Sequence, residues 1–176
     1  MTEQQLLGAS AAQGNASHAS EIAGRYTEAL KRYFGDRLVS VVLYGSVARS
    51  DHTPASDIDL LIVARGLPQS RRARNRVLVE IEEELFPMLA SLHRQGKYTD
   101  VSTKIKTPEE ARQPTPLYLD MTEDAVILYD RDGFFQSVLD RLRQRLKALG
   151  AQRIRQGKVW YWKLKPDYQW GEVIEL

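Results

Sequence analysis

Apolar residues recur at helical spacing in three stretches of the chain. The first covers residues 20–34, where apolar side chains follow one another at i, i+4 positions. The second covers residues 70–94 and contains Pro87, which we expect to kink or divide the helix. The third begins at Phe134 and ends before Gly150, a residue type that often follows the last turn of a helix.

Short apolar or alternating runs between these stretches predict four strands, at residues 39–44, 58–63, 99–106 and 125–129. Short helical turns are expected at residues 108–110 and 117–123, and a last hairpin is expected to turn at Gly157–Lys158. Alternating strands and helices predict an α/β fold. Because only about a dozen residues join the first two strands, near the minimum for a parallel crossover, we expect a small mixed sheet flanked by helices.

The same pattern divides the 176 residues into three parts. Residues 1–19 are rich in Ala, Ser, Gln and Gly without an apolar period, which predicts a flexible leader. Residues 20–130 form the expected core. Residues 131–176 are expected to form a C-terminal helix and an aromatic hairpin that pack on this core. The length fits one domain with a modest appendage.

Composition narrows the class of protein. No apolar run approaches the ~18 residues that a membrane helix needs, and the first residues are too polar for a signal peptide, so we expect no membrane partner. Cysteine is absent, which excludes disulfides, thiolate metal ligands and a cysteine nucleophile. A reducing compartment is the default for such a chain, and we expect the cytoplasm.

The formal net charge of +2 hides an uneven distribution. Residues 77–130 carry eleven acidic and five basic side chains, whereas residues 131–165 carry ten basic and two acidic ones. Solvated helix faces would give such a pattern, and so would a basic segment that docks an acidic or phosphate-bearing partner. The small total gives no argument from charge for a nucleic-acid partner, and we do not expect one.

Two carboxylates, Asp57 and Asp59, lie two residues apart at an apolar strand. Side chains at this spacing leave the same face of a strand, while Ile58 between them points into the core. Close carboxylates repel each other, and a hard cation relieves that cost; oxygen-only ligands favour Mg²⁺ or Mn²⁺. A third carboxylate is expected from a neighbouring strand, and Asp100 is the best candidate.

Gly45 and Ser46 follow the first strand, ten residues before the acidic pair. Glycine lets a phosphate approach the backbone, and N–H groups together with the serine hydroxyl can hold its oxygens. A phosphate cradle combined with a metal-binding pair predicts phosphoryl or nucleotidyl transfer.

This arrangement resembles the signature of the minimal nucleotidyltransferases of the DNA polymerase β superfamily, in which Gly-Ser precedes Asp-x-Asp by about ten residues. The resemblance is closest over residues 39–105. It implies the small mixed sheet already expected, and transfer of a nucleotide, usually AMP from ATP, to a hydroxyl with release of pyrophosphate. The enzyme would depend on two Mg²⁺ ions.

Carried over by position, the resemblance assigns roles to individual residues. Asp57, Asp59 and Asp100 would bind the metal ions, and Asp100 would also help to deprotonate the attacking hydroxyl. Gly45 and Ser46 would hold the β- and γ-phosphates. Arg49 is a further candidate for contact with the triphosphate, although a surface arginine paired with an acid is an equally good interpretation.

The resemblance also bears on the acceptor. Small prokaryotic enzymes of this kind commonly act as antitoxins that adenylylate a tyrosine of a HEPN-domain RNase toxin, and we expect such a partner. Two alternatives remain open: a small-molecule acceptor of the aminoglycoside type, and a catalytically silent module that only binds a partner. The arginine-rich segment 71–76 and the aromatic C-terminal hairpin each have a structural interpretation beside a functional one.

Overall fold

The computed structural model describes residues 3–49, 51, 56–94, 100–157 and 159–176, with side chains from residue 18 onward except that of Val159. Its centre is a four-stranded sheet in the order β3-β2-β1-β4, whose strands are β1 (Leu38–Tyr44), β2 (Ile58–Ala64), β3 (Val101–Lys106) and β4 (Val126–Asp130). β1 is antiparallel to both β2 and β4, whereas β2 and β3 are parallel. The predicted mixed sheet is confirmed.

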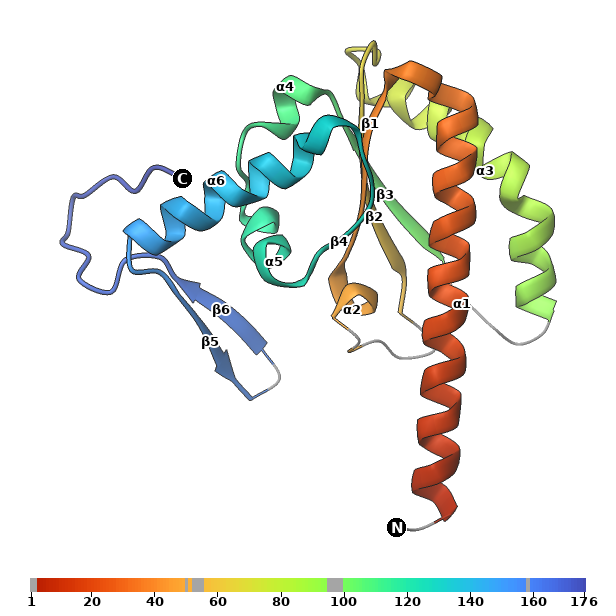
Figure 1. Ribbon diagram of the computed structural model, residues 1–176, viewed down its shortest axis with the longest axis horizontal. Coiled ribbons are helices and arrows are strands. Elements are labelled where there is room, and N and C mark those ends of the chain that lie inside the picture. Colours follow the sequence, from red (N-terminus) through yellow and green to blue (C-terminus); the bar gives the residue numbers. More distant parts are fainter. Residues whose placement is uncertain (1–2, 50, 52–55, 95–99, 158) are drawn as a thin grey trace.

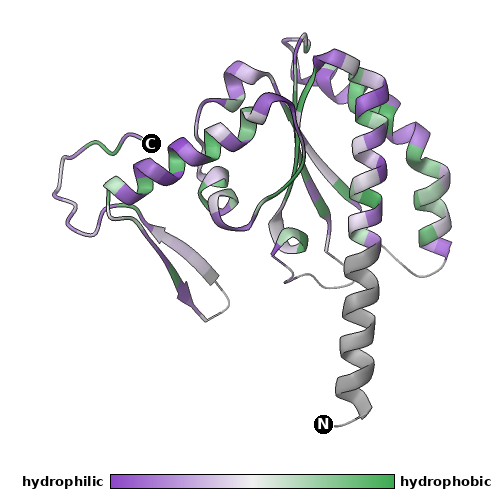
Figure 2. Ribbon diagram, in the orientation of Figure 1, coloured by the Kyte–Doolittle hydropathy of each residue, from purple (hydrophilic) through white to green (hydrophobic). Residues whose placement is uncertain are grey.

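Helices cover both faces of this sheet (Figure 1). One face packs against the long helices α1 (Glu3–Phe34) and α3 (Arg71–Arg94), the other against α5 (Pro116–Asp124) and α6 (Phe134–Ala148). Successive residues of β1 and β2 alternate between the two core clusters, because neighbouring side chains of a strand point to opposite faces. Figure 2 shows the sheet as the most apolar part of the molecule.

Shorter elements complete the chain. They are α2 (Gly45–Ala48), α4 (Pro108–Ala111), the 3₁₀ turns Gly35–Arg37 and Arg131–Gly133, and the hairpin strands β5 (Gln152–Gln156) and β6 (Val159–Lys163). The predicted C-terminal hairpin is therefore present, with Gly157 at its turn; Lys158 lies outside the described residues. In the part of the chain that the structure describes, no helix is long and apolar enough to cross a membrane.

Two features of the helices bear on the sequence prediction. Residues 3–19, for which a flexible leader was expected, belong to α1. The Glu, Gln, Leu and Ala residues of this segment are strong helix formers, so intrinsic propensity continues the helix without an apolar period. Pro87 lies inside α3, which continues through it, so of the two expected effects the division is absent and the kink stays a prediction. Buried Ile81 and Leu85 anchor the preceding turns against the sheet and offset the backbone hydrogen bond that proline cannot make.

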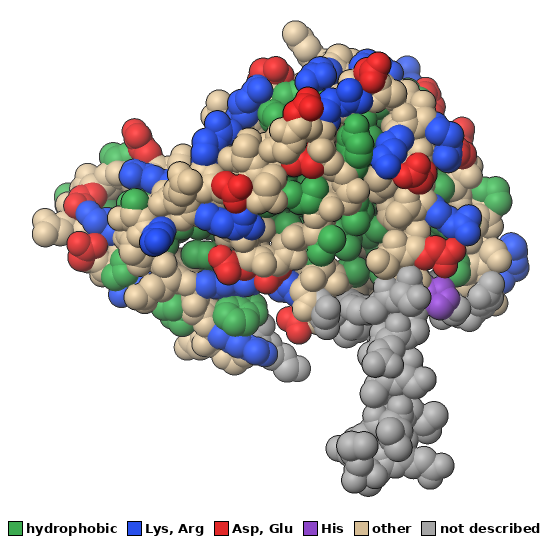
Figure 3. All heavy atoms as spheres, viewed as in Figure 1, with side chains coloured by type: hydrophobic (Ala, Val, Ile, Leu, Met, Phe, Trp, Pro, Cys, Tyr) green, Lys and Arg blue, Asp and Glu red, His purple; other side chains and the backbone are tan. Residues whose placement is uncertain are grey.

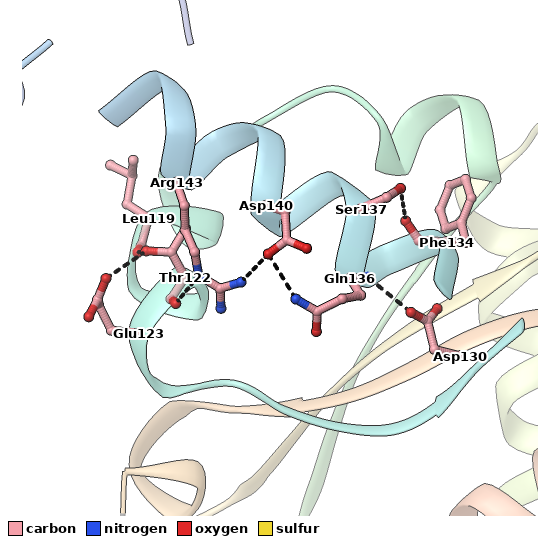
Figure 4. A network of polar contacts seen from close by, with 9 residues as sticks. All are labelled: Leu119, Thr122, Glu123, Asp130, Phe134, Gln136, Ser137, Asp140 and Arg143. Atoms are coloured by element: carbon pink, nitrogen blue, oxygen red, sulfur yellow. Dashed lines mark hydrogen bonds and ion pairs between the residues drawn. The ribbon is translucent and has the colours of Figure 1, made fainter. Parts of the chain in front are cut away.

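Asp130, the last residue of β4, ties α6 to the sheet (Figure 4). Its carboxylate accepts the backbone N–H groups of Phe135 and Gln136, both at 2.9 Å. It also accepts the hydroxyl of Ser40, a fully buried residue of β1, at 2.6 Å. One side chain thus satisfies two free N–H groups at the start of α6 and a buried hydroxyl of the sheet.

We expect Asp130→Ala to lower the free energy of unfolding by about 2–3 kcal/mol, because it removes a helix cap and leaves the buried Ser40 hydroxyl without a partner. Asp140→Ala is the control, because Asp140 contacts only exposed side chains of its own helix, Gln136 and Arg143. It should cost less than about 1 kcal/mol. Urea denaturation measures both, and equal losses would contradict this role of Asp130.

Candidate active site

The register of β1 and β2 brings the Gly-Ser segment against the acidic pair. Tyr44, the last residue of β1, lies opposite Asp59. Gly45 follows with φ of +77°, a backbone conformation that other residues rarely adopt. A Cβ built on Gly45 would lie 2.2 Å from Oδ2 of Asp59, far inside van der Waals contact. Only glycine therefore leaves the Asp59 carboxylate where it is.

The carboxylate of Asp59 is partly buried. Burial raises the pKa of its carboxyl, a hydrogen bond with the Ser102 side chain lowers it, and the charge of Asp57 raises it again. The net effect is a raised pKa, with Lys104 and Arg49 acting in the opposite direction as the nearby cations. Asp57 itself is exposed and immediately precedes β2. The role of the two carboxylates as metal ligands stays a prediction.

Asp100 lies immediately before β3. Its backbone carbonyl accepts the N–H of Ile58 at 2.8 Å, and Ile58 pairs with Val101, so Asp100 is level with Asp57 on the neighbouring strand. Its side chain is exposed. Within the described ranges, no group of three or more His, Cys, Asp or Glu side chains is close enough to hold a metal ion. The role of Asp100 as third carboxylate stays a prediction.

The residues that are present fit a magnesium ion. Mg²⁺ usually keeps several waters and takes one or two protein carboxylates together with substrate phosphates. Asp57 and Asp59 supply two carboxylates, and the raised pKa of Asp59 shows that its environment disfavours a bare negative charge. A nearby cation would stabilise the ionised form.

A small cavity of about 110 Å³ lies beside Gly45, between α2 and α5. Tyr44 and Arg49 line it, and each carries a buried polar atom, the Tyr44 hydroxyl and Nε of Arg49, with no hydrogen-bond partner among the described residues. Burial, followed by the charge of Asp59, raises the pKa of Tyr44 to about 12, so Tyr44 is a neutral hydrogen-bond donor. The guanidinium of Arg49 lies 3.9 Å from the Asp51 carboxylate, a long ion pair. Both groups are available to a ligand that enters from this side.

Several residues of this region were not singled out from the sequence. Tyr44 directly precedes the glycine, and Ser102 lies on the same polar strand face as Lys104, so adjacency and alternation were the available signals. Asp120 and Asp124 line the same cavity from α5, where their i, i+4 spacing is a weak signal. His52 and Ser50 lie outside the described residues.

A second, larger cavity of about 400 Å³ lies between α3 and β3 and has a basic lining. Arg71, Arg74, Lys104 and Lys106 contribute to its walls, but Arg74 is held by Glu110 through hydrogen bonds of 2.7 and 2.9 Å. This cavity does not include the acidic pair or Gly45. Contact of the arginine-rich segment with a phosphate or a partner stays a prediction.

Comparison with known proteins decides the family. The family described as nucleotidyltransferase domain matches residues 24–129, more than half of the chain and all of the site described above. The chain belongs to the nucleotidyltransferase family. A relative from Methanocaldococcus jannaschii, the candidate protein adenylyltransferase MJ1305, is 31% identical over 143 residues, which cover 80% of this chain and 92% of the relative.

Two solved structures resemble this nucleotidyltransferase at lower identity. A candidate nucleotidyltransferase from Sulfolobus solfataricus is 20% identical with a TM-score of 0.47, covering 69% of this chain and 88% of its own. A mutant of the toxin–antitoxin pair MntA–HpeT is 16% identical with a TM-score of 0.46, covering 71% and 90%. Likenesses of this size carry no argument about function. The family match makes the protein an enzyme of the nucleotidyltransferase class.

Gly45→Ala should remove activity by displacing the Asp59 carboxylate. We expect a loss of about 1–2 kcal/mol of stability from the left-handed backbone, and a much larger loss of nucleotidyl transfer. Gly133→Ala is the matched control, because Gly133 has φ of +63° with nothing within 4 Å of a Cβ. It should show the stability loss alone. Similar transfer rates in the two variants would show that nucleotidyl transfer does not depend on the close approach of Gly45 to Asp59.

Asp59→Asn should stabilise the folded protein at neutral pH. Because the pKa of Asp59 is raised on folding, the folded state holds this proton to higher pH than the unfolded chain, and stability falls as pH rises through that interval. The neutral amide removes this cost. Urea denaturation should show the variant more stable than wild type at pH 7, with the advantage shrinking towards about pH 3, where both states are protonated. A less stable variant at pH 7 would contradict this assignment.

Proposed function

We propose that this enzyme transfers AMP from ATP to a tyrosine hydroxyl of a HEPN-domain toxin, in a reaction that depends on Mg²⁺ and releases pyrophosphate. The observation that carries the proposal is the contact between the Gly45 backbone and the Asp59 carboxylate. It places a backbone that a phosphate can approach directly beside a carboxylate that can hold a cation. Nucleotidyl transfer requires that a phosphate-binding backbone and a metal-binding carboxylate lie close together.

A protein acceptor is supported by the relative MJ1305, which is itself named as a candidate protein adenylyltransferase and aligns over four fifths of this chain. A basic segment at residues 131–165 offers a surface for an acidic partner. A small-molecule acceptor and a silent binding module are the alternatives, and the experiment below separates them.

In the proposed reaction the acceptor oxygen attacks the α-phosphorus of ATP, and the bond from this phosphorus to the bridging oxygen of the β-phosphate breaks. Pyrophosphate leaves with that oxygen, and the hydroxyl proton passes to a carboxylate, for which Asp100 is the candidate. Gly45 and Ser46 would hold the β- and γ-phosphates, and Arg49 would offer its guanidinium to their oxygens. Asp57 and Asp59 would hold Mg²⁺, which stabilises the charge on the attacking and leaving oxygens when bound.

The test is incubation of the protein with ATP labelled at the α-phosphate, Mg²⁺ and a HEPN protein encoded beside it. Label should appear on a tyrosine of the partner. Asp59→Asn should reduce the rate by at least about 100-fold, since a cation at the reacting phosphate is worth several kcal/mol. Asp140→Asn, a change of an exposed helix residue outside the site, should not reduce it.

Three outcomes would speak against the proposal. Label on an aminoglycoside but not on the protein would favour a small-molecule acceptor. Neutralisation of the toxin by wild type and Asp59→Asn alike, without label transfer, would favour the silent binding module. Label on a residue other than tyrosine would contradict the proposed target while keeping the reaction.

A further inference from the structure

Two side chains of the C-terminal hairpin, the half-buried Arg153 and Trp162, connect it to α5. In β5, Arg153 donates a hydrogen bond of 2.5 Å from its guanidinium to Oδ2 of Asp124, and its Nε lies 3.6 Å from Oδ1 of Asp120. From β6, the indole N–H of Trp162 donates to the same oxygen of Asp120 at 2.9 Å. Two of the three carboxylates of α5, those of Asp120 and Asp124, are thus held by the hairpin. Figure 3 shows acidic and basic side chains interleaved where the hairpin meets the rest of the molecule.

The guanidinium of Arg153 is well enclosed. The ring of Trp160 lies 4.5 Å from its Cζ, measured to the ring centroid. The side chain is 14% exposed and that of Asp124 is 22% exposed. Little water therefore screens the pair, and its charges act more strongly than those of a surface ion pair.

The two carboxylates also form part of the active-site wall. Asp120 and Asp124 line the small cavity beside Gly45, together with Tyr44 and Arg49. A triphosphate beside Gly45 would therefore face Asp120 and Asp124. Arg153 would lie next to these two carboxylates without touching the triphosphate itself. Without Arg153, two negative charges would confront an anionic substrate.

We propose that Arg153 is a positioning residue of the nucleotide site: it neutralises Asp120 and Asp124 and fixes them as the wall that admits the triphosphate. The hairpin thereby becomes part of the active site, although it lies beyond residues 24–129, which the nucleotidyltransferase family covers. This inference rests on the proposed function, because it requires that ATP phosphates lie beside Gly45.

The size of the effect follows from Coulomb's law. One unit charge about 10 Å from another contributes roughly 0.4–1.7 kcal/mol between the dielectric limits of water and a protein surface. Loss of the Arg153 charge should therefore weaken binding of a non-hydrolysable ATP analogue by about 2- to 17-fold, the factor to which these energies correspond. The KM for ATP should rise by a similar factor while kcat changes little, since no reacting atom is touched.

The experiment measures binding of that analogue by calorimetry for wild type, Arg153→Met and Arg155→Met. Arg155 is the matched control: it lies in the same strand, its Cζ is 5.3 Å from the centroid of the same Trp160 ring, and its Nε donates to the Gly157 carbonyl. Its Nε is directed to Gly157 rather than to Asp120 or Asp124. Arg155→Met should bind as wild type does, and Arg153→Met should bind more weakly.

A rescue experiment distinguishes an effect of the Arg153 charge on ATP binding from a purely structural role of the hairpin. Asp120→Asn and Asp124→Asn added to Arg153→Met remove the uncompensated charges and should restore most of the lost affinity, whereas a hairpin that merely supports the fold would not be repaired by them. If Arg153→Met does not fold, Arg153→Lys, which keeps the charge, and the triple variant carry the same comparison. Both should bind close to wild-type strength.

Failure of the proposed function and failure of the inference about Arg153 give different results. Wild-type protein that binds no ATP analogue overturns the proposed function and this inference with it. Normal binding by wild type together with unchanged affinity in Arg153→Met overturns the inference alone. So does a folded triple variant that remains as weak as Arg153→Met.

Discussion

The active site depends on one close approach, that of the Gly45 backbone to the Asp59 carboxylate. It exists because β1 and β2 are antiparallel and in a register that sets Tyr44 opposite Asp59, so the residue after β1 meets the start of β2. A shift by one residue would turn Asp59 to the other face of the sheet, into the core against α1 and α3. The apolar alternation of the two strands fixes that register.

This arrangement costs stability and gives the site its chemistry. The Asp59 charge is partly desolvated, and the Tyr44 hydroxyl and Nε of Arg49 are buried without hydrogen-bond partners. Groups of this kind destabilise a fold unless a ligand satisfies them. Stable interactions elsewhere offset the cost, among them the Asp130 carboxylate that joins β4, β1 and α6.

Local patterns in the sequence were enough to predict most of this architecture. The apolar period indicated α1, α3 and α6, and the short connection between β1 and β2 indicated a mixed sheet. The spacing of Gly45, Ser46, Asp57 and Asp59 predicts the candidate site. The start of α1 was missed because helix propensity, without amphipathic pattern, extends it to Glu3. The contacts of Arg153 with Asp120 and Asp124 were missed for another reason: they join residues 29 or more positions apart, and only the folded hairpin brings them together.

The most direct test of this account is a crystal structure of the protein with Mg²⁺ and a non-hydrolysable ATP analogue. The account predicts phosphate oxygens beside the backbone of Gly45 and Ser46, and a cation shared between these oxygens and the carboxylates of Asp57 and Asp59. A triphosphate seated instead in the basic cavity between α3 and β3, with no cation on Asp59, would contradict it.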